Sequence, residues 1–216
     1  MEHNSAIPQS ALQAALFSQG GLIIGITGGT GCGKTTALEV IRQLGGMVID
    51  CDAVYHDLLA NDQALLAGIE NRFPGTVTNG VLDRKALGNI VFADDSALLA
   101  LNAITHPAVK AAVLHRLKSC PDLAAIDAIA LFEGGLSELC HVTVAVTAPT
   151  EDRIVRLMAR EGISRQYAEK RIAAQKSNDY FSSLCDYTLE NNSTQEAFRL
   201  KCLAFFSRQD IIKKNK

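Results

Sequence analysis

Residues 28–35 read Gly-Gly-Thr-Gly-Cys-Gly-Lys-Thr, which fits the pattern G-x-x-x-x-G-K-[ST]. A short apolar run, Leu22–Thr27, precedes them, and a helical pattern from Lys34 to Leu44 follows. Glycines here let backbone N–H groups converge on phosphate oxygens, and the positive end of the helix dipole favours the same anion. The sequence therefore predicts a phosphate-binding loop between a buried strand and a helix. The alternative is a glycine turn that only joins the two elements.

Each position of the loop has an expected role. Lys34 should reach the β- and γ-phosphates, and the Thr35 hydroxyl should bind Mg²⁺. Cys32 most simply fills a position that needs a small residue, and its place at a helix N-terminus leaves a redox switch as the alternative. The residues of this segment that we expect to bind the nucleotide are Gly29, Thr30, Gly31, Cys32, Gly33, Lys34, Thr35 and Thr36.

Strand and helix signals alternate along the rest of the chain. The strand patterns are residues 47–50, 124–132, 142–147 and 187–190, and the helical patterns after the insertion are about 150–160 and 164–176. A last helix should open with a capping box made by Ser193 and Glu196. The pattern predicts an α/β fold: a P-loop NTPase with a five-stranded parallel sheet flanked by helices. We expect the nucleoside- and nucleotide-kinase type of this fold, with an inserted helical subdomain and a helical lid.

The expected organisation is one P-loop kinase domain, residues 21–216, after an N-terminal extension, residues 1–20. Strand signals are missing from about 53 to 120, which predicts a helical insertion there. The lid is expected at about 150–180. The core is then divided among residues of about 21–52, 121–150 and 185–216.

Composition narrows the function classes. The chain has 216 residues and a net charge of -2, so it offers no global positive field for a nucleic acid backbone. Its six cysteines form no C-x-x-C pair, which favours reduced thiols and a cytoplasmic protein. The apolar runs are interrupted before the ~20 residues of a membrane span, and the first 20 residues lack a signal peptide pattern. We expect a soluble monomer or weak homo-oligomer that acts on a small molecule.

Two carboxylates follow the second strand. Asp50 and Asp52 come directly after Met47–Ile49, and open α/β sheets bind ligands at the carboxyl ends of their strands. A carboxylate there can orient an acceptor hydroxyl and accept its proton during phosphoryl transfer. The alternative is that they are only a helix N-cap and a solvated turn.

Three arginines share one helix face. Arg153, Arg156 and Arg160 are spaced three and four residues apart, in the helix after the fourth strand. On a lid, such arginines would neutralise transition-state charge and exclude water. The alternative is a solvated face whose arginines pair with neighbouring acidic residues.

These segments together resemble the dephospho-CoA kinase family. The resemblance rests on TGGTGCGKT at 27–35, Leu-Gly at 44–45 and VIDCD at 48–52, and it runs from about Ile23 to about Asn192. Further matches, in the same order, are Asp83-Arg84, Val91-Phe92, Leu101-Asn102, His106-Pro107, Asp127 to Glu133, Gln175, and Asp186 before Asn191.

The resemblance implies transfer of the ATP γ-phosphoryl group to the ribose 3′-hydroxyl of dephospho-CoA, the last step of coenzyme A biosynthesis. It implies Asp52 as the base and Arg156 and Arg160 as lid residues, whereas the family commonly has glutamine at Arg153. It places Asn191 near the adenine of ATP. The resemblance also implies that the helical insertion, about 53–120, binds the acceptor, and that the acceptor-binding residues are Asp52, His56, His106 and Asp127.

Some positions leave alternatives open. His106 precedes a proline and can equally be an ordinary helix terminus, and His56 stands where many relatives have arginine. Ile129 and Ala130 replace a proline and a leucine of the family pattern, and Ser193 replaces a glycine. Another small-molecule P-loop kinase is an alternative function. A non-catalytic or switch-like nucleotide-binding protein is a weaker one, because the chain has no guanine-reading N-K-x-D.

Overall fold

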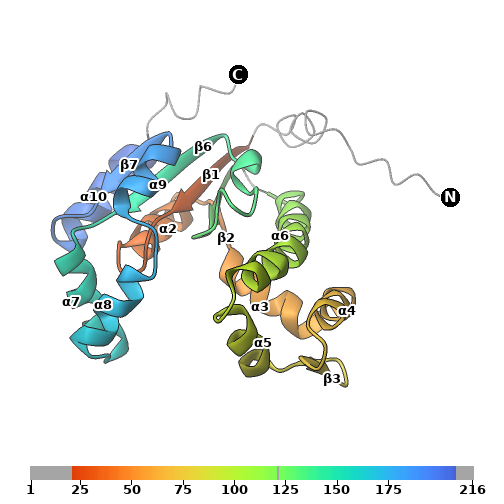
Figure 1. Cartoon of the computed structure of the whole chain (residues 1–216). Helices are drawn as coiled ribbons and strands as arrows, with labels where there is room; N and C mark the ends of the chain where they lie inside the picture. Colours follow the sequence, from red (N-terminus) through yellow and green to blue (C-terminus); the bar gives the residue numbers. More distant parts are fainter. Residues whose placement is uncertain (1–20, 121, 208–216) are drawn as a thin grey trace.

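The computed structural model describes residues 21–120 and 122–207. The predicted N-terminal extension, residues 1–20, lies outside the described residues, as does the end of the predicted core, residues 208–216. A strand core carries one group of helices at each side of its carboxyl edge, α7 and α8 on one side and α3 to α6 on the other (Figure 1). In chain order the elements are β1 (Leu22–Thr27), α2 (Lys34–Gln43), β2 (Met47–Asp50), α3 (Cys51–Asn61), α4 (Gln63–Arg72), β3 (Val77–Thr78), β4 (Val81–Leu82), α5 (Arg84–Val91), α6 (Asp95–Leu117), β5 (Leu123–Asp127), η1 (Ser137–Leu139), β6 (Val142–Thr147), α7 (Thr150–Glu161), α8 (Arg165–Ala173), α9 (Asn178–Leu184), β7 (Tyr187–Glu190) and α10 (Gln195–Phe206).

The main sheet confirms the predicted fold class. Its five strands are all parallel and lie in the order β2-β5-β1-β6-β7. Strand β5 lies between β1 and β2, so the strand that ends at Asp50 is not the direct neighbour of the strand before the phosphate loop. The end of β5, at Asp127, therefore lies between them.

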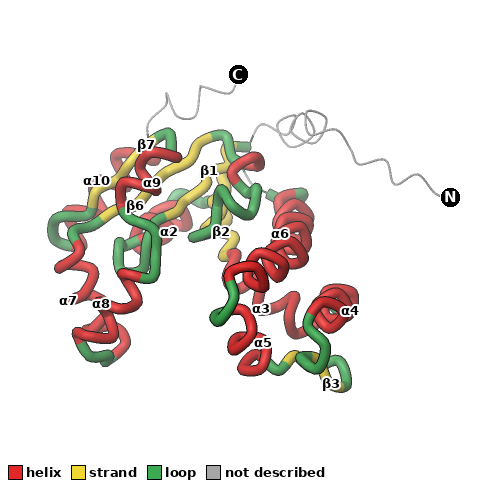
Figure 2. The backbone as a smooth tube through the Cα atoms, viewed as in Figure 1, coloured by secondary structure: helices red, strands yellow, loops and turns green. Residues whose placement is uncertain are grey.

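Alternation along β1 builds two cores. Ile24 and Ile26 pack with α2 and α10 on one face of the sheet, and Ile23 packs with α3 and α6 on the other. Every residue of β1 is buried, as expected of a central strand covered on both faces. The helices cover the two faces of the sheet, and loops follow the carboxyl ends of its strands (Figure 2).

The predicted helical insertion is mainly helical. Helices α3 to α6 share a third apolar cluster that includes Leu59, Ile69 and Leu101. A small antiparallel hairpin, β3 and β4, was not expected there. Its turn is Asn79-Gly80, and both residues have positive φ, 52° and 74°, as a tight two-residue hairpin turn requires.

Helix α6 is long and apolar enough to cross a membrane by length and composition alone, with a mean hydropathy of 1.4. In the fold it behaves as the core helix of a subdomain. Its buried residues, among them Leu101 and Val109, pack in the apolar clusters of the insertion and of the sheet, and α6 contacts α3, α4 and α5.

The region predicted as the lid, about 150–180, contains α7, α8 and the start of α9. Helices α7 and α8 enclose a small apolar cluster of Ile154, Leu157, Ala168 and Ile172, with Gly162 between the helices at φ 66°. The predicted helix at 164–176 ends earlier, at Ala173. The additional helix α9 begins after Ser177, whose side chain caps it by accepting from Tyr180 N–H.

Two local predictions were wrong. The strand expected at 124–132 ends at Asp127, the register partner of the last residue of β2, and the chain then enters a turn. Glu133 also lies in this turn. The N-cap of α10 is Thr194, which accepts from Ala197 N–H, and Glu196 bonds Arg199 instead of completing a capping box with Ser193.

Candidate active site

The phosphate loop depends on glycine for its shape. Gly28, Gly31 and Gly33 have φ values of 139°, 76° and 101°, which other residues rarely adopt. A Cβ on Gly28 would lie 2.1 Å from the Val146 carbonyl oxygen, and one on Gly33 would lie 2.3 Å from Asn191 Nδ2. The loop is therefore folded tightly against β6 and against the turn after β7.

Side chains bind two of the loop carbonyls. Asn191 Nδ2 donates to the Cys32 oxygen at 3.0 Å, and Lys34 Nζ donates to the Gly28 oxygen at 2.9 Å. In a trans peptide the C=O and the next N–H point in opposite directions. A carbonyl held from behind, such as that of Cys32, thus turns the following N–H, that of Gly33, toward the front of the loop.

A cavity of about 460 Å³ lies in front of the loop, and we call it the phosphate cavity. Lys34 and Thr35 from the start of α2 contribute to it, with carboxylates from the ends of β5 and α3's first turn and arginines from the lid. Its full lining is Gly29, Thr30, Gly31, Gly33, Lys34, Thr35, Thr36, Glu39, Asp52, Asp127, Ile129, Arg156, Arg160, Arg171, Gln175 and Gln195.

Two of the predicted nucleotide-binding residues do not line this cavity. The Cys32 side chain is fully buried in the core behind the loop, as expected of a small-residue position. Asn191 is 4% exposed and contacts the loop from behind through the Cys32 carbonyl. Their side chains shape the loop rather than face its front.

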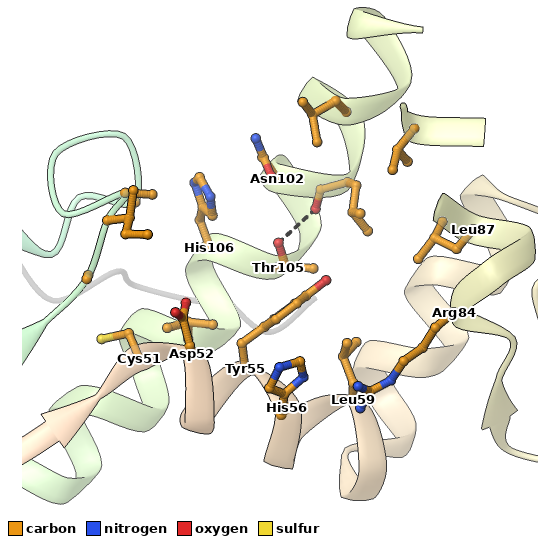
Figure 3. Close-up of a pocket in the computed structure, with 18 of the residues that line it drawn as sticks. Cys51, Asp52, Tyr55, His56, Leu59, Arg84, Leu87, Asn102, Thr105 and His106 are labelled. Carbon is orange, nitrogen blue, oxygen red and sulfur yellow. Dashed lines mark hydrogen bonds between the residues drawn. The ribbon is translucent and has the colours of Figure 1, made fainter. Parts of the chain in front are cut away.

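A second cavity, of about 380 Å³, lies between α3, α5, α6 and the turn after β5, and we call it the acceptor cavity. It is mainly apolar, with Leu87 and Val109 among its lining residues. Figure 3 draws Asp52, Tyr55 and His56 on α3, with Asn102, Thr105 and His106 on α6 and Arg84 on α5. Asp52 and Ile129 line both cavities, so the two meet at Asp52.

The three acidic residues at the sheet edge have different environments. Asp50 is the N-cap of α3 and accepts from Ala53 N–H at 3.0 Å, which agrees with the alternative reading of this residue. Asp52 is in the first turn of α3, exposed to both cavities. Asp127, the register partner of Asp50, ends β5 and lines the phosphate cavity only.

Asp127 is the unusual carboxylate. Its Oδ1 atom is buried and has no hydrogen-bond partner among the described residues. Burial raises the pKa of this carboxyl to about 6; the Lys34 charge opposes the rise, and the Asp50 and Asp52 charges add to it. Such a group binds a proton or a cation readily.

The three arginines of α7 do not act as one face. Arg153 is 3% exposed and binds the phosphate loop from behind, where its Nε donates to the Thr30 oxygen at 2.9 Å. Arg156 donates to the Gly31 oxygen and to Asn191, and it lines the phosphate cavity. Arg160 lines the cavity and pairs with Glu161 at 2.6 Å.

Sequence reasoning gave no site role to Arg171 and Gln175. Both line the phosphate cavity from the far side of the lid, and Arg171 pairs with the same Glu161 as Arg160 does. Gln175 had a signal, because it is one of the positions in the family resemblance. Arg84 and Asn102, which line the acceptor cavity, had the same signal.

The predicted acceptor residues on the insertion lie in the acceptor cavity. His56 lines it from α3, and His106 lines it from α6 while its Nδ1 lies 3.1 Å from the Glu133 carbonyl oxygen. Two thiols, those of Cys51 and Cys140, are held in the unreactive protonated form. Burial, with the Asp127 charge next, raises the pKa of Cys51 to about 12, and burial raises that of Cys140 further.

No group of three or more His, Cys, Asp or Glu side chains that could hold a metal occurs within residues 21–120 and 122–207. A divalent cation at this site would need ligands from phosphate and water beside the protein's own oxygens, as is common for Mg²⁺. Two residues of the phosphate cavity could supply such oxygens: Thr35 through its hydroxyl, and Asp127 through its buried carboxylate oxygen that has no partner among the described residues.

Comparison with known proteins agrees with this geometry. A family model described as dephospho-CoA kinase matches residues 22–196. The dephospho-CoA kinase of Latilactobacillus sakei is 34% identical over 181 residues, which are 82% of this chain and 90% of that protein. Among solved structures, TT1252 from Thermus thermophilus has a TM-score of 0.72 at 34% identity, covering 87% of this chain and 98% of that one. The dephospho-CoA kinase from Campylobacter jejuni has a TM-score of 0.62 at 26% identity, covering 90% and 98%.

Proposed function

This chain belongs to the dephospho-CoA kinase family, and we propose that in it Asp52 activates the acceptor hydroxyl at the point where two cavities meet. The activity is ATP-dependent phosphorylation of the ribose 3′-hydroxyl of dephospho-CoA, which yields coenzyme A and ADP. The observation that carries the residue assignment is that Asp52 lines both the phosphate cavity and the acceptor cavity.

The acceptor cavity suits a long acceptor with an apolar part. Leucine and valine side chains from α5 and α6 contribute to its wall, and Arg84, Asn102 and His106 add polar groups. Such a wall can hold the pantetheine arm, while the polar groups orient the nucleotide part. The adenosine end would then reach Asp52, where the cavities meet.

The reaction at that junction is a transfer between two oxygens. The Asp52 carboxylate accepts the proton of the acceptor hydroxyl while that oxygen forms its bond to the γ-phosphorus, and the bond from phosphorus to the β–γ bridging oxygen breaks. ADP leaves with that oxygen. Because Asp52 lines both cavities, its carboxylate can contact the acceptor hydroxyl from its place in the first turn of α3.

Lys34, Arg156 and Arg160 supply positive charge in the phosphate cavity. Lys34 Nζ donates to the Gly28 carbonyl oxygen, and Lys34, Arg156 and Arg160 all line the phosphate cavity. Charge developing on the transferred group and on the leaving oxygen is stabilised best by donors already in place. Thr30, Gly31 and Gly33 contribute their backbone groups from the loop.

The residues present fit Mg²⁺. The Thr35 hydroxyl lines the phosphate cavity, and the buried Asp127 oxygen without a partner suits a cation or one of its water ligands. We propose that these two residues hold the ion with the β- and γ-phosphates. When bound, it neutralises phosphate charge and helps to align the γ-phosphoryl group.

We further propose that the protein acts in the cytoplasm, as a monomer or weak homo-oligomer, without nucleic acid or membrane partners. Its net charge of -2 supports the absence of a nucleic acid partner. The packing of α6 within the insertion supports the absence of a membrane span.

A product assay tests the function. Purified protein is incubated with ATP, Mg²⁺ and dephospho-CoA, and the products are separated, identified and quantified by mass spectrometry. We expect coenzyme A and ADP in equal amounts. Coenzyme A itself is the matched control acceptor, because its 3′-hydroxyl is already phosphorylated, and it should give no ADP above background. Folded, ATP-binding protein that makes no coenzyme A would contradict the proposal.

A further inference from the structure

Arg153 has no role in the mechanism above, yet it is the one arginine of its helix that is almost fully buried. Its side chain is 3% exposed, and it makes no salt bridge with the carboxylates of the described residues. Its two bonded acceptors are uncharged: the Thr30 carbonyl oxygen, 2.9 Å from Nε, and Gln175 Oε1, 3.1 Å from Nη2. A buried guanidinium without a counter-charge is costly, so a reason for its presence is needed.

Gln175 completes a closed network around Thr30. The same Oε1 atom accepts the Thr30 N–H at 2.8 Å, so the two polar backbone groups of Thr30 are both bound by lid-segment side chains. Arg153 comes from the first turn of α7, and Gln175 comes just after α8. The two ends of the lid segment therefore meet at one residue of the phosphate loop.

The fit around this network is tight. A Cβ on Gly29 would lie 2.4 Å from Arg153 Nη2, and one on Gly31 would lie 2.9 Å from the Arg153 carbonyl oxygen. The glycines on both sides of Thr30 thus leave room for Arg153 as well as giving the loop its backbone angles.

The hydrogen bond to the Thr30 carbonyl also orients a donor. Because the peptide between Thr30 and Gly31 is planar and trans, a carbonyl drawn back toward Arg153 turns the Gly31 N–H the opposite way. Gly31 lines the phosphate cavity, on the side of the loop where the triphosphate is expected. The Arg153 charge lies directly behind the same peptide.

We propose that Arg153, with Gln175, is a positioning residue that pre-forms the outer part of the phosphate loop and ties it to the lid. It fixes the Thr30–Gly31 peptide before ATP binds, and the bound triphosphate supplies the counter-charge that the protein does not. Arg153 itself does not contact the nucleotide. The proposal rests on the assignment of residues 28–36 as the ATP site.

The test compares Arg153→Met, Gln175→Ala and the double variant, with Arg153→Lys as the conservative replacement. ATP dissociation constants, both KM values and kcat are measured. Arg153→Met should weaken ATP binding and raise KM for ATP roughly tenfold, the size of one hydrogen bond to a charged group, with the KM for dephospho-CoA within about twofold of the parent. Arg153→Lys should recover most of the loss because it keeps the charge.

The double variant should bind ATP about as weakly as Arg153→Met alone, because both side chains act through Thr30. Arg199→Met is the matched control: Arg199 pairs with Glu196 on the surface of α10, and this variant should bind ATP like the parent. A merely structural role would lower kcat with the fraction of active protein and leave ATP affinity unchanged.

Three results would overturn the proposal: unchanged ATP affinity in Arg153→Met and Gln175→Ala, losses that multiply in the double variant, or no recovery in Arg153→Lys. If Arg153→Met does not fold, Gln175→Ala and Arg153→Lys still decide, because Gln175→Ala should weaken ATP binding and Arg153→Lys should preserve most of it. Failure of the parent protein to bind ATP would instead contradict the assignment of the ATP site.

Discussion

The Nη2 atom of Arg160 lies 2.6 Å from Oε1 of Glu161, so this lid arginine is paired with its neighbour in the chain. Arg171, from the other lid helix, bonds the second oxygen of the same carboxylate. Both arginines line the phosphate cavity. Exposed pairs of this kind are weak, so a triphosphate can replace Glu161 as their partner. Glu161 thus holds two arginine side chains beside the phosphate cavity.

Replacing Arg160 tests its proposed role in transfer. Arg160→Met should lower kcat by about 100-fold or more, because it removes a charge that stabilises the transferring phosphoryl group. Steady-state kinetics at saturating substrates measure this. Arg165→Met is the control on the same lid: Arg165 pairs with Glu151 and Glu169 and does not line the cavity, so kcat should stay within about twofold. Equal losses in both variants would mean that the lid is disturbed in general.

Glu161→Gln tests the competition between carboxylate and phosphate. Without the negative charge, Arg160 and Arg171 have no ionic partner to give up, so KM for ATP should fall about two- to fivefold. The fall should shrink at high salt because exposed charges are screened. A raised KM for ATP would show instead that Glu161 positions the arginines for binding.

Asp127 predicts a pH dependence of stability. Its pKa is about 6 in the folded protein against an ordinary 3.8, so from about pH 4 to 6 the folded state keeps a proton that the unfolded state has lost. The free energy of unfolding should therefore fall as pH rises through that range and stay lower above it, by about 3 kcal/mol in total.

Asp127→Asn should abolish that dependence. Urea unfolding of metal-free protein should show the variant more stable than the parent at pH 8 and equal to it below about pH 4. If the two proteins have the same pH dependence, Asp127 ionises normally and the unpartnered oxygen has no energetic consequence. Added Mg²⁺ should stabilise the parent more than the variant if Asp127 helps to hold the ion.

Phe92 tests the acceptor cavity. It is 87% exposed although it lines that cavity, so its removal costs the fold little. Phe92→Ala should raise KM for dephospho-CoA about fivefold, through lost apolar contact, with no change in KM for ATP. Leu99→Ala is the matched control, because Leu99 is 69% exposed and does not line the cavity. An unchanged acceptor KM in Phe92→Ala would move the acceptor elsewhere.

The parts of the site that the sequence predicted are those encoded locally. The phosphate loop follows the fully buried strand β1, and Asp52 comes just after the end of β2, so a short pattern and the rule for strand ends were enough to find them. The sheet was predictable because its strands are apolar runs separated by helices. The end of β5 was not, because it depends on where the neighbouring strands stop.

The side-chain contacts that hold the phosphate loop could not be predicted from local sequence patterns, because the partners are far apart in the chain. Asn191 bonds the Cys32 carbonyl across 159 residues of sequence, and Gln175 bonds the Thr30 N–H across 145. The spacing of Arg153, Arg156 and Arg160 predicted a common helix face. It could not show that Arg153 faces the loop from behind while Arg160 faces the cavity, since that depends on how α7 packs.

The central claim is that Asp52 acts on the acceptor where the two cavities meet, and Asp52→Asn tests it most directly. We predict that turnover of dephospho-CoA falls by about 100-fold or more while the ATP dissociation constant changes by less than about twofold, because the side chain keeps its shape and loses only its ability to take a proton. Turnover close to that of the parent in folded Asp52→Asn would contradict the account.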